Sequence, residues 1–175
     1  EHSPAPRLAA FDGLERVVHI GSFSKTLSAS IRCGFIAAPH GWIDGLADLR
    51  IATSFGGGRL ASELVLALLR DGSYRKHVEA LRARLARAMA ETAPRLEALG
   101  IVPWIEQPTG MFLWCSLPDG IDAAEIARKA LAANVVLAPG NAFSLSGHAD
   151  RFMRFNVAQC DDDRIFAALG AAMGR

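Results

Sequence analysis

Two predicted strands joined by a polar loop constrain the fold of this chain most strongly. The β-branched run Arg16–Ile20 predicts one strand, and the apolar run Cys33–Ala38 predicts a second strand that stops at a proline. Between them the chain reads GSFSKTLSASIR, a segment of small and hydroxyl side chains that favours a turn. The loop that connects the two strands therefore carries Lys25 and Arg32.

The side chains around Lys25 suit a phosphate group. Ser22 and Ser24 offer hydroxyl donors, and Arg32 offers the forked donors of a guanidinium. An amine beside a phosphate site suggests pyridoxal 5'-phosphate held by Lys25 as a Schiff base. Such a lysine must be neutral when it attacks an aldehyde, and a cation at Arg32 favours the neutral form. The competing interpretation is a surface lysine in a serine-rich turn; the whole pattern, with Gly34 and the second strand, favours the cofactor site.

Length and composition limit the remaining possibilities. With 175 residues, of which 51% are hydrophobic, the chain has room for one domain or parts of two and for a sizeable core. The net charge of +1 argues against an extended nucleic-acid or membrane surface, and neither a membrane span nor a signal peptide is visible. The three cysteines lack metal-ligand spacing, so we expect buried, reduced thiols and a cytoplasmic protein.

The middle of the chain is predicted to be helical. Apolar residues at helical spacing predict helices over His40–Leu49 and Leu60–Arg70, and a long helix that follows Ser73 as its N-cap and ends at Leu99. The glycines of Thr53–Gly58 interrupt this stretch. Four arginines of the long helix are expected to form a solvated face, which would also suit an acidic partner: Arg75, Arg82, Arg84 and Arg87.

The C-terminal part alternates strands and helices. The predicted order is strand, strand, helix, strand, strand, helix, over these ranges: Ile101–Glu106, Met111–Leu117, Ala123–Asn134, Val135–Leu137, Phe152–Val157 and a last helix that ends at Met173. Asp122 and Asp161 are predicted to cap the two helices. A joint near residues 72–75 predicts one domain over residues 1–72 and another over residues 73–175.

The lysine segment resembles a known family. Gly21–Gly34 is similar to the pyridoxal-phosphate lysine segment of the class I/II (fold type I) aminotransferases. Three further motifs resemble that family and follow its order: Pro108–Trp114, Val135–Phe143 and Phe152–Asn156. The resemblance is nearest to the branch that contains 2-aminoadipate and aromatic aminotransferases and the GntR/MocR regulators.

The resemblance implies an α/β fold, in which the end of a large, mainly parallel-sheet cofactor domain is followed by a small α+β domain. It implies that Lys25 is the Schiff-base lysine and moves the substrate's α-proton, and that Ser22, Ser24 and Arg32 bind the cofactor phosphate. Arg154 matches the arginine that binds the substrate α-carboxylate, for which a bidentate guanidinium is suited. The alternative for Arg154 is a structural salt bridge on an edge strand.

For function, the resemblance implies pyridoxal-phosphate chemistry on an amino acid, with transamination as the leading reaction, in a homodimer. The favoured interpretation is the aminotransferase-like effector domain of a GntR/MocR transcriptional regulator, whose DNA contacts belong to an N-terminal domain outside this chain. The alternative is a free-standing amino-acid aminotransferase that uses a 2-oxo acid acceptor. A third interpretation is an interaction domain without a cofactor.

Some of the family's cofactor-binding features precede the lysine. They are a glycine-rich phosphate turn, an aromatic residue that stacks on the ring, and an aspartate under the ring nitrogen. We therefore interpret the chain as the C-terminal piece of a longer protein, inactive by itself. The stretch Thr53–Gly58 is a candidate to reach toward a dimer partner, and the resemblance implies that Asn141 and Ser144 lie near the mouth of the site. The histidines lack metal-ligand spacing, so no metal site is expected.

Overall fold

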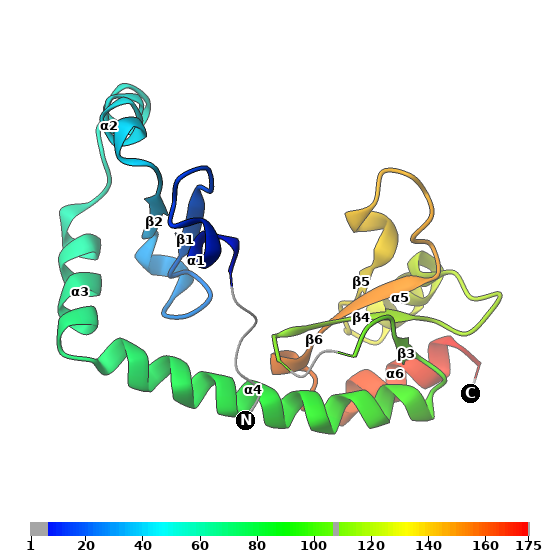
Figure 1. The fold of residues 1–175 in the computed structure, drawn as a ribbon. Helices are drawn as coiled ribbons and strands as arrows, with labels where there is room; N and C mark the ends of the chain where they lie inside the picture. The colour runs from blue at the N-terminus through cyan, green and yellow to red at the C-terminus, as the bar shows by residue number, and fades with distance from the viewer. Residues whose placement is uncertain (1–6, 107–108, 175) are drawn as a thin grey trace. The chain divides into compact units, whose positions relative to one another are not determined.

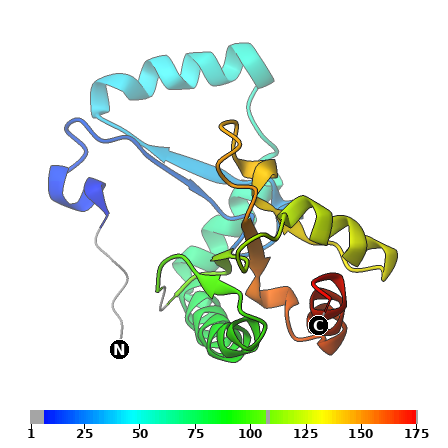
Figure 2. The same ribbon diagram turned by 90° about the vertical axis from the view of Figure 1, so that its right-hand side faces the viewer.

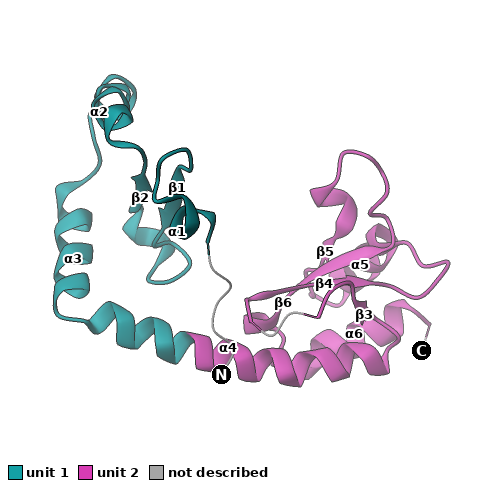
Figure 3. Ribbon diagram, in the orientation of Figure 1, with its two compact units in different colours: residues 1–81 teal, residues 82–175 magenta. Residues whose placement is uncertain are grey.

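The computed structural model describes residues 7–106 and 109–174. It divides into two compact units, and the boundary between them falls within a long helix (Figures 1 and 3). Unit 1 spans residues 1–81 and unit 2 spans residues 82–175. Unit 1 contains α1 (Leu8–Asp12), β1 (His19–Ser22), η1 (Ala29–Ile31), β2 (Gly34–Ala37), α2 (His40–Ser54), α3 (Arg59–Arg70) and the first part of α4 (Ser73–Ala98). Pro108, the first residue of one motif named above, lies outside the described residues.

Strands β1 and β2 form an antiparallel hairpin that requires glycine at two positions. Gly21 lies opposite Phe35, and Ser22 lies opposite Gly34. A Cβ atom at Gly21 would come within 2.3 Å of the Phe35 ring, and one at Gly34 within 2.7 Å of the Gly21 carbonyl oxygen. Both distances are far below van der Waals contact, so these glycines let the two strands pair at this spacing.

The first strand begins at His19, not at Arg16 as the sequence predicted. The Asp12 carboxylate accepts the backbone N–H groups of Arg16 and Val17 at 2.6 and 2.8 Å, so these residues close a turn instead of joining the strand ladder. The same hydrogen bonds, that of Arg16 first, hold the pKa of Asp12 below its ordinary value.

Helix α2 extends to Ser54, whereas the prediction ended it at Leu49. The hydroxyl of Thr53 donates to the Leu49 carbonyl at 2.7 Å, and the hydroxyl of Ser54 donates to the Arg50 carbonyl at 3.0 Å. These bonds supply side-chain donors to carbonyls of the last turns. The predicted break is therefore confined to Phe55–Gly58, whose first residue has a φ of 51°.

Unit 1 has little core of its own. Among its described residues, the buried hydrophobic side chains are Phe23 and Val65. Large apolar side chains of the hairpin, of α2 and of the loop after it are exposed: Ile20, Ile36, Trp42, Leu49, Ile51 and Phe55. Burying apolar surface stabilises a domain by about 25 cal/mol per Å². Unit 1 by itself therefore leaves much of its potential hydrophobic stabilisation unused.

Unit 2 has the predicted order of strands and helices. After the second part of α4 it contains β3 (Val102–Pro103), β4 (Phe112–Ser116), α5 (Ala123–Ala132), β5 (Ala138–Pro139), η2 (Gly140–Phe143), β6 (Phe152–Asn156), η3 (Val157–Gln159) and α6 (Asp163–Ala172). The strands form one antiparallel sheet in the order β3-β4-β6-β5, and α6 follows the β6 strand toward the C-terminus (Figure 2).

The α/β class is confirmed, with helices and two small sheets. The strand pairs that the structure describes in both units are antiparallel. The mainly parallel sheet expected of the family's large domain is therefore not represented among the described residues.

Alternating burial in β4 and β6 separates a core face of the sheet from an open face. Leu113 and Cys115 of β4 are buried, as are Met153 and Phe155 of β6, while the residues between them are partly buried. These four side chains share one cluster with residues of three helices: Leu96 of α4, Ile126 of α5, and Phe166 and Leu169 of α6. The helices therefore cover one face, and the alternate residues lie on the other, among them Phe112, Trp114, Phe152 and Arg154.

Two predicted strands of unit 2 are wrong in extent because the ends of preceding helices use their first residues. The strand predicted over Val135–Leu137 is displaced to β5, since the N–H of Val135 still donates to the Ala130 carbonyl of α5. The strand predicted over Ile101–Glu106 shrinks to β3, since the N–H of Ile101 donates to the last turn of α4. Val136, which lies in the predicted strand but not in β5, is 83% exposed.

The helix caps of unit 2 follow the prediction in one case and not in the other. Asp122 caps α5 as predicted, with its carboxylate accepting the N–H of Glu125 at 2.8 Å. The last helix is capped by Asp162 instead of Asp161, and the Asp162 carboxylate accepts the N–H of Arg164 at 2.9 Å. The side chain of Arg164 bonds the same carboxylate and, with that N–H, holds the pKa of Asp162 below its ordinary value.

The three cysteines are free thiols. Cys115 and Cys160 are buried as predicted, whereas Cys33 is only partly buried. Burial raises the pKa of Cys115 to about 12 and also raises the pKa of Cys160. Because the thiolate is the reactive form, both buried thiols are inert packing residues at neutral pH.

Helix α4 continues unbroken through Pro94. Four of its arginines, Arg75, Arg82, Arg84 and Arg87, are exposed, which confirms the predicted solvated face. In the described part of the chain, no helix combines the length and apolar character needed to cross a membrane.

Replacing Gly140 by alanine should destabilise unit 2. A Cβ atom there would come within 2.2 Å of the Ala149 carbonyl oxygen and 2.8 Å of the Phe152 carbonyl oxygen, and neither backbone atom can rotate away. We expect the free energy of unfolding, measured by urea denaturation, to fall by about 2–3 kcal/mol. Gly45→Ala in α2, where a Cβ meets no atom within 4 Å, is the control and should not destabilise. Equal effects of the two substitutions would contradict the close approach.

Candidate cofactor and amino-acid site

The lysine loop is a compact turn at the end of the β1–β2 hairpin. The N–H of Phe23 donates to the Cys33 carbonyl at 3.0 Å and closes the loop. The N–H of Leu27 then donates to the Phe23 carbonyl at 2.8 Å, which makes a turn around Lys25. Lys25 is exposed at this turn. Backbone hydrogen bonds of residues on both sides of Lys25 therefore hold the backbone of this turn in place.

Phe23 anchors the loop to the rest of unit 1. Its ring is buried, 5.9 Å from the Phe35 ring and 5.5 Å from the Tyr74 ring, which meets it edge-on. The Tyr74 hydroxyl donates to the Thr26 hydroxyl at 3.0 Å. Helix α4 thus contacts the loop on both sides of Lys25, once through a ring and once through a hydroxyl.

The serine hydroxyls of the loop accept hydrogen bonds from its backbone. Ser22 Oγ accepts the N–H of Ser24, and Ser28 Oγ accepts the N–H of Ser30, each at 3.2 Å. A hydroxyl that accepts one bond still has its own proton to donate. Among the described residues, the side chain of Lys25 makes no hydrogen bond or ion pair. The loop therefore presents hydroxyl groups that can still donate a proton. It also presents the Lys25 amine, which bonds to no described protein group.

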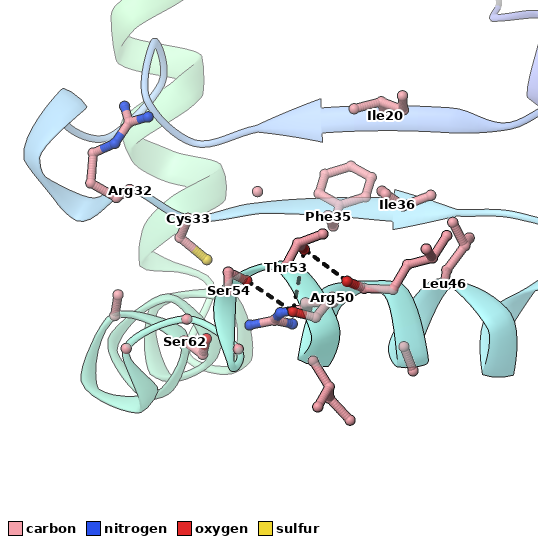
Figure 4. Close-up of a pocket in the computed structure, with 18 of the residues that line it drawn as sticks. Ile20, Arg32, Cys33, Phe35, Ile36, Leu46, Arg50, Thr53, Ser54 and Ser62 are labelled. Carbon is pink, nitrogen blue, oxygen red and sulfur yellow. Dashed lines mark hydrogen bonds between the residues drawn. The ribbon is translucent and has the colours of Figure 1, made fainter.

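Arg32 lies at the other end of the loop, directly after η1, with a left-handed backbone (φ 49°). It lines a groove of about 1010 Å³ between the hairpin and α2 (Figure 4). The groove is bordered by Cys33 and Phe35 on the hairpin side and by residues of α2 and Gly56–Gly58 on the other. Lys25 is not among the described residues that line it. The structure therefore places Ser22, Ser24, Lys25 and Arg32 on one loop but brings only Arg32 to the groove.

Arg154 lies in unit 2, on the open face of the sheet. In β6 it is opposite Trp114 of β4 and Ala138 of β5. Its guanidinium carbon is 4.0 Å from the centre of the Phe143 ring and 4.5 Å from the centre of the Phe112 ring. Two aromatic rings therefore hold this partly buried cation by cation–π contact.

The salt-bridge alternative for Arg154 is wrong for the described structure. Strand β6 is internal to the sheet, between β4 and β5, and is not an edge strand. Within residues 7–106 and 109–174, the Arg154 side chain has no carboxylate partner. Arg95, which also lies over a ring (Phe166, 3.7 Å), differs because Asp163 pairs with it. The N–H donors of Arg154 are therefore unused by the protein groups described.

An aromatic cluster surrounds Arg154. The Trp114 ring stacks on Phe152 at 5.5 Å and meets Phe143 edge-on at 6.0 Å, and Trp104 meets Phe152 edge-on at 5.3 Å. The sequence motifs contained all of these rings except Trp104, but nothing in the sequence assigned them to Arg154. Their proximity depends on which strands pair and in what register, which a single sequence does not reveal.

The remaining candidates lie at the surface. Asn141 is exposed in η2, and the Ser144 hydroxyl shares a hydrogen bond of 3.0 Å with that of Ser146. Of the stretch Thr53–Gly58, the first two residues belong to α2 and the glycines border the groove.

The sequence that contains the lysine loop and the open face matches the model of a known family. The model of aminotransferase class I and II matches residues 2–171, nearly the whole chain. The chain belongs to the class I and II aminotransferase family.

Within this family the chain is similar to both regulators and enzymes. The HTH-type transcriptional regulator NorG of Staphylococcus aureus is 31% identical over 169 residues, which are 95% of this chain and 38% of NorG. Aromatic-amino-acid aminotransferase 1 of Thermococcus litoralis is 28% identical over 169 residues, 93% of this chain and 39% of that protein.

A solved structure extends this likeness to three dimensions. LysN, an α-aminoadipate aminotransferase of Thermus thermophilus crystallised with N-(5'-phosphopyridoxyl)-L-leucine, superposes with a TM-score of 0.77 at 28% identity. The match covers 95% of this chain and 44% of LysN. The chain thus spans 38% and 39% of the two curated relatives and corresponds to the C-terminal portion of such proteins.

Removing the Tyr74 hydroxyl should loosen the lysine loop. Tyr74→Phe keeps the ring against Phe23 but removes the hydrogen bond to Thr26, which contributes about 1 kcal/mol. We expect faster hydrogen exchange of the Leu27 amide in the native protein. Thr26→Val removes the same bond, so the double variant should exchange no faster than either single variant. Additive effects would show that the hydroxyl pair does not act as one interaction.

Proposed function

We propose that this chain is the C-terminal part of a protein that binds pyridoxal 5'-phosphate and an amino acid, and that the whole protein is a GntR/MocR-type transcriptional regulator. In this proposal the amino acid is an effector, and an N-terminal domain outside the chain binds DNA. The observation that carries the proposal is Arg154, a partly buried guanidinium that two rings hold and no described carboxylate pairs.

The lysine loop supports the cofactor. Ser22 has a hydroxyl proton to donate, Arg32 adds guanidinium donors, and neither is bonded to a carboxylate among the described residues. This donor set fits a phosphate. Pyridoxal phosphate, when bound, supplies an aldehyde that reacts with amines and a ring that withdraws electrons from the substrate's α-carbon. Lys25 holds the cofactor and moves a proton at the α-carbon, and Ser24 adds a further phosphate contact.

Arg154 supports the choice of an amino acid as ligand. A guanidinium binds a planar carboxylate through two parallel N–H donors, which a lysine cannot offer. Because the rings contact the guanidinium without consuming its donors, Arg154 keeps them for the α-carboxylate.

The likeness to NorG supports the regulator, and the likeness to the Thermococcus and Thermus enzymes supports the second candidate, a free-standing aminotransferase with a 2-oxo acid acceptor. Sequencing the gene upstream of the codon for Glu1 separates the two. A winged-helix segment ahead of the aminotransferase-like part would support the regulator. A large domain that starts at the initiator methionine would support the enzyme.

The proposal has further parts that rest on the family resemblance. The whole protein is a cytoplasmic homodimer, and the stretch Thr53–Gly58, of which Phe55–Gly58 lies outside α2, reaches toward the partner. The large domain ends at residue 72 and the small domain spans residues 73–175. An interaction domain without a cofactor would instead show no cofactor absorbance and no response to changes at Lys25.

Borohydride reduction of the cofactor-loaded full-length protein should attach the phosphopyridoxyl group to Lys25. The described chain offers a sharp comparison because its sequence contains only two other lysines, Lys76 and Lys129. Lys129 is paired with Glu125 at 2.8 Å, and Lys76 is exposed on α4. Peptide mass spectrometry would locate the adduct. Lys25→Ala should abolish the labelling of this chain, while Lys76→Ala leaves it intact; an adduct on Lys76 or Lys129 would refute the assignment.

Arg154→Lys should weaken amino-acid binding and spare the cofactor. Lysine keeps the charge but loses the bidentate geometry, so we expect roughly ten- to a hundredfold weaker binding of the amino acid. Equilibrium titration of the loaded full-length protein measures the change, and the cofactor absorbance should stay the same. Arg151→Lys is the matched control, because Arg151 lies three positions away and already pairs with Asp119 at 3.3 Å. Joint loss of cofactor and ligand binding would indicate a structural role.

A further inference from the structure

We propose that Phe143 and Phe112 are positioning residues, which hold Arg154 ready for a carboxylate and thereby set the affinity for it. The proposal rests on the carboxylate role of Arg154 proposed above. The guanidinium carbon lies 4.0 Å from the Phe143 ring centre and 4.5 Å from the Phe112 ring centre. The rings come from two different elements, η2 and β4, so the packing of unit 2 brings them to the same cation.

Phe112 belongs to the sheet, and Phe143 packs against a residue of the sheet. Phe112 lies in β4 two residues before Trp114, which is opposite Arg154, so Phe112 is a diagonal neighbour on the same face. Phe143 ends η2 and meets the Trp114 ring edge-on at 6.0 Å. The first residue of η2, Gly140, leaves no space for a Cβ atom against the backbone of Phe152. Each ring therefore has a structural anchor other than Arg154.

A ring holds an arginine in a different way from a carboxylate. An acidic partner neutralises the charge and occupies N–H donors, as Asp163 does for Arg95. A ring contacts the guanidinium through its π-electrons and leaves the N–H donors and the charge for a ligand. Arg154 has ring contacts as Arg95 does, but no acidic partner within residues 7–106 and 109–174.

Holding the side chain in advance strengthens ligand binding. An arginine that binds a carboxylate loses rotamer entropy, and this loss weakens binding unless the side chain is already ordered. Removing one ring should restore the freedom of Arg154 and weaken only those ligands that bind through it. The effect should therefore follow the carboxylate group of the ligand and not its side chain.

The test compares an amino acid with its decarboxylated amine on the cofactor-loaded full-length protein. The probe pair is whichever of the twenty protein amino acids binds most tightly, together with the amine derived from it. Phe143→Ala should weaken the amino acid about fivefold, the value expected for losing one cation–π contact, and leave the affinity of the amine unchanged. Phe112→Ala should act in the same direction, and Phe143→Tyr should restore binding.

Two comparisons separate positioning from general damage to the fold. Trp104→Ala removes another exposed ring of the open face, which contacts Phe152 and not Arg154, and it should leave the ratio of amino-acid to amine affinity unchanged. In an Arg154→Ala background, Phe143→Ala should cause no further loss of amino-acid binding.

The outcomes distinguish this inference from the proposal on which it rests. If no amino acid binds, or if Arg154→Ala leaves amino-acid binding intact, the carboxylate role of Arg154 fails. If Arg154→Ala weakens the amino acid but both phenylalanine variants bind it normally, only the positioning role is overturned. Equal weakening of amino acid and amine in Phe143→Ala would also overturn it, because the ring would then act on the whole site.

Discussion

The pairing register of β4 on β6 is the constraint on which unit 2 depends. Leu113 lies opposite Phe155 and Cys115 opposite Met153, and these pairs form the sheet's contribution to the core. Because successive side chains point to opposite faces, a slip of one residue would turn Arg154 into the core and expose these apolar side chains. The register that buries the core residues therefore also determines which side chains lie on the open face. One set of backbone hydrogen bonds determines both the stability of the unit and the surroundings of Arg154.

Unit 1 orders its loop without a comparable core. Phe23 is the one buried side chain of the loop, and it packs against Phe35 and Tyr74. Backbone hydrogen bonds and the Tyr74 hydroxyl supply the other contacts that stabilise the loop. Because only a few specific contacts stabilise the loop, its polar side chains stay at the surface. Packing them into a larger core would require each polar group to find a partner. This explains how the loop is well defined while Lys25 remains exposed.

The sequence predicted what depends on local chemistry and missed what depends on pairing. Apolar periodicity gave the order of elements in unit 2, and an isolated aspartate gave the cap at Asp122. Three consecutive aspartates lie at the start of the last helix, and each of them could cap it. The sequence predicted Asp161, whereas the exact start of the helix makes Asp162 the cap. The Tyr74–Thr26 bond joins residues 48 positions apart, and the two rings over Arg154 come from β4 and η2. Such contacts follow from the tertiary structure, so the family resemblance could name Arg154 but not the residues that hold it.

The open face is built differently from what stability alone requires. A sheet covered by helices on one face is satisfied by polar side chains on the other. Here that face carries Trp114, Phe152 and Phe112, and the nearby Phe143 is 47% exposed, so apolar surface stays in contact with water. Partly buried and exposed rings, grouped around an arginine whose donors the described residues do not use, fit the two halves of the proposed ligand site, an apolar wall and an anion contact. Core packing accounts for neither half, whereas a bound carboxylate with an organic side chain would satisfy both.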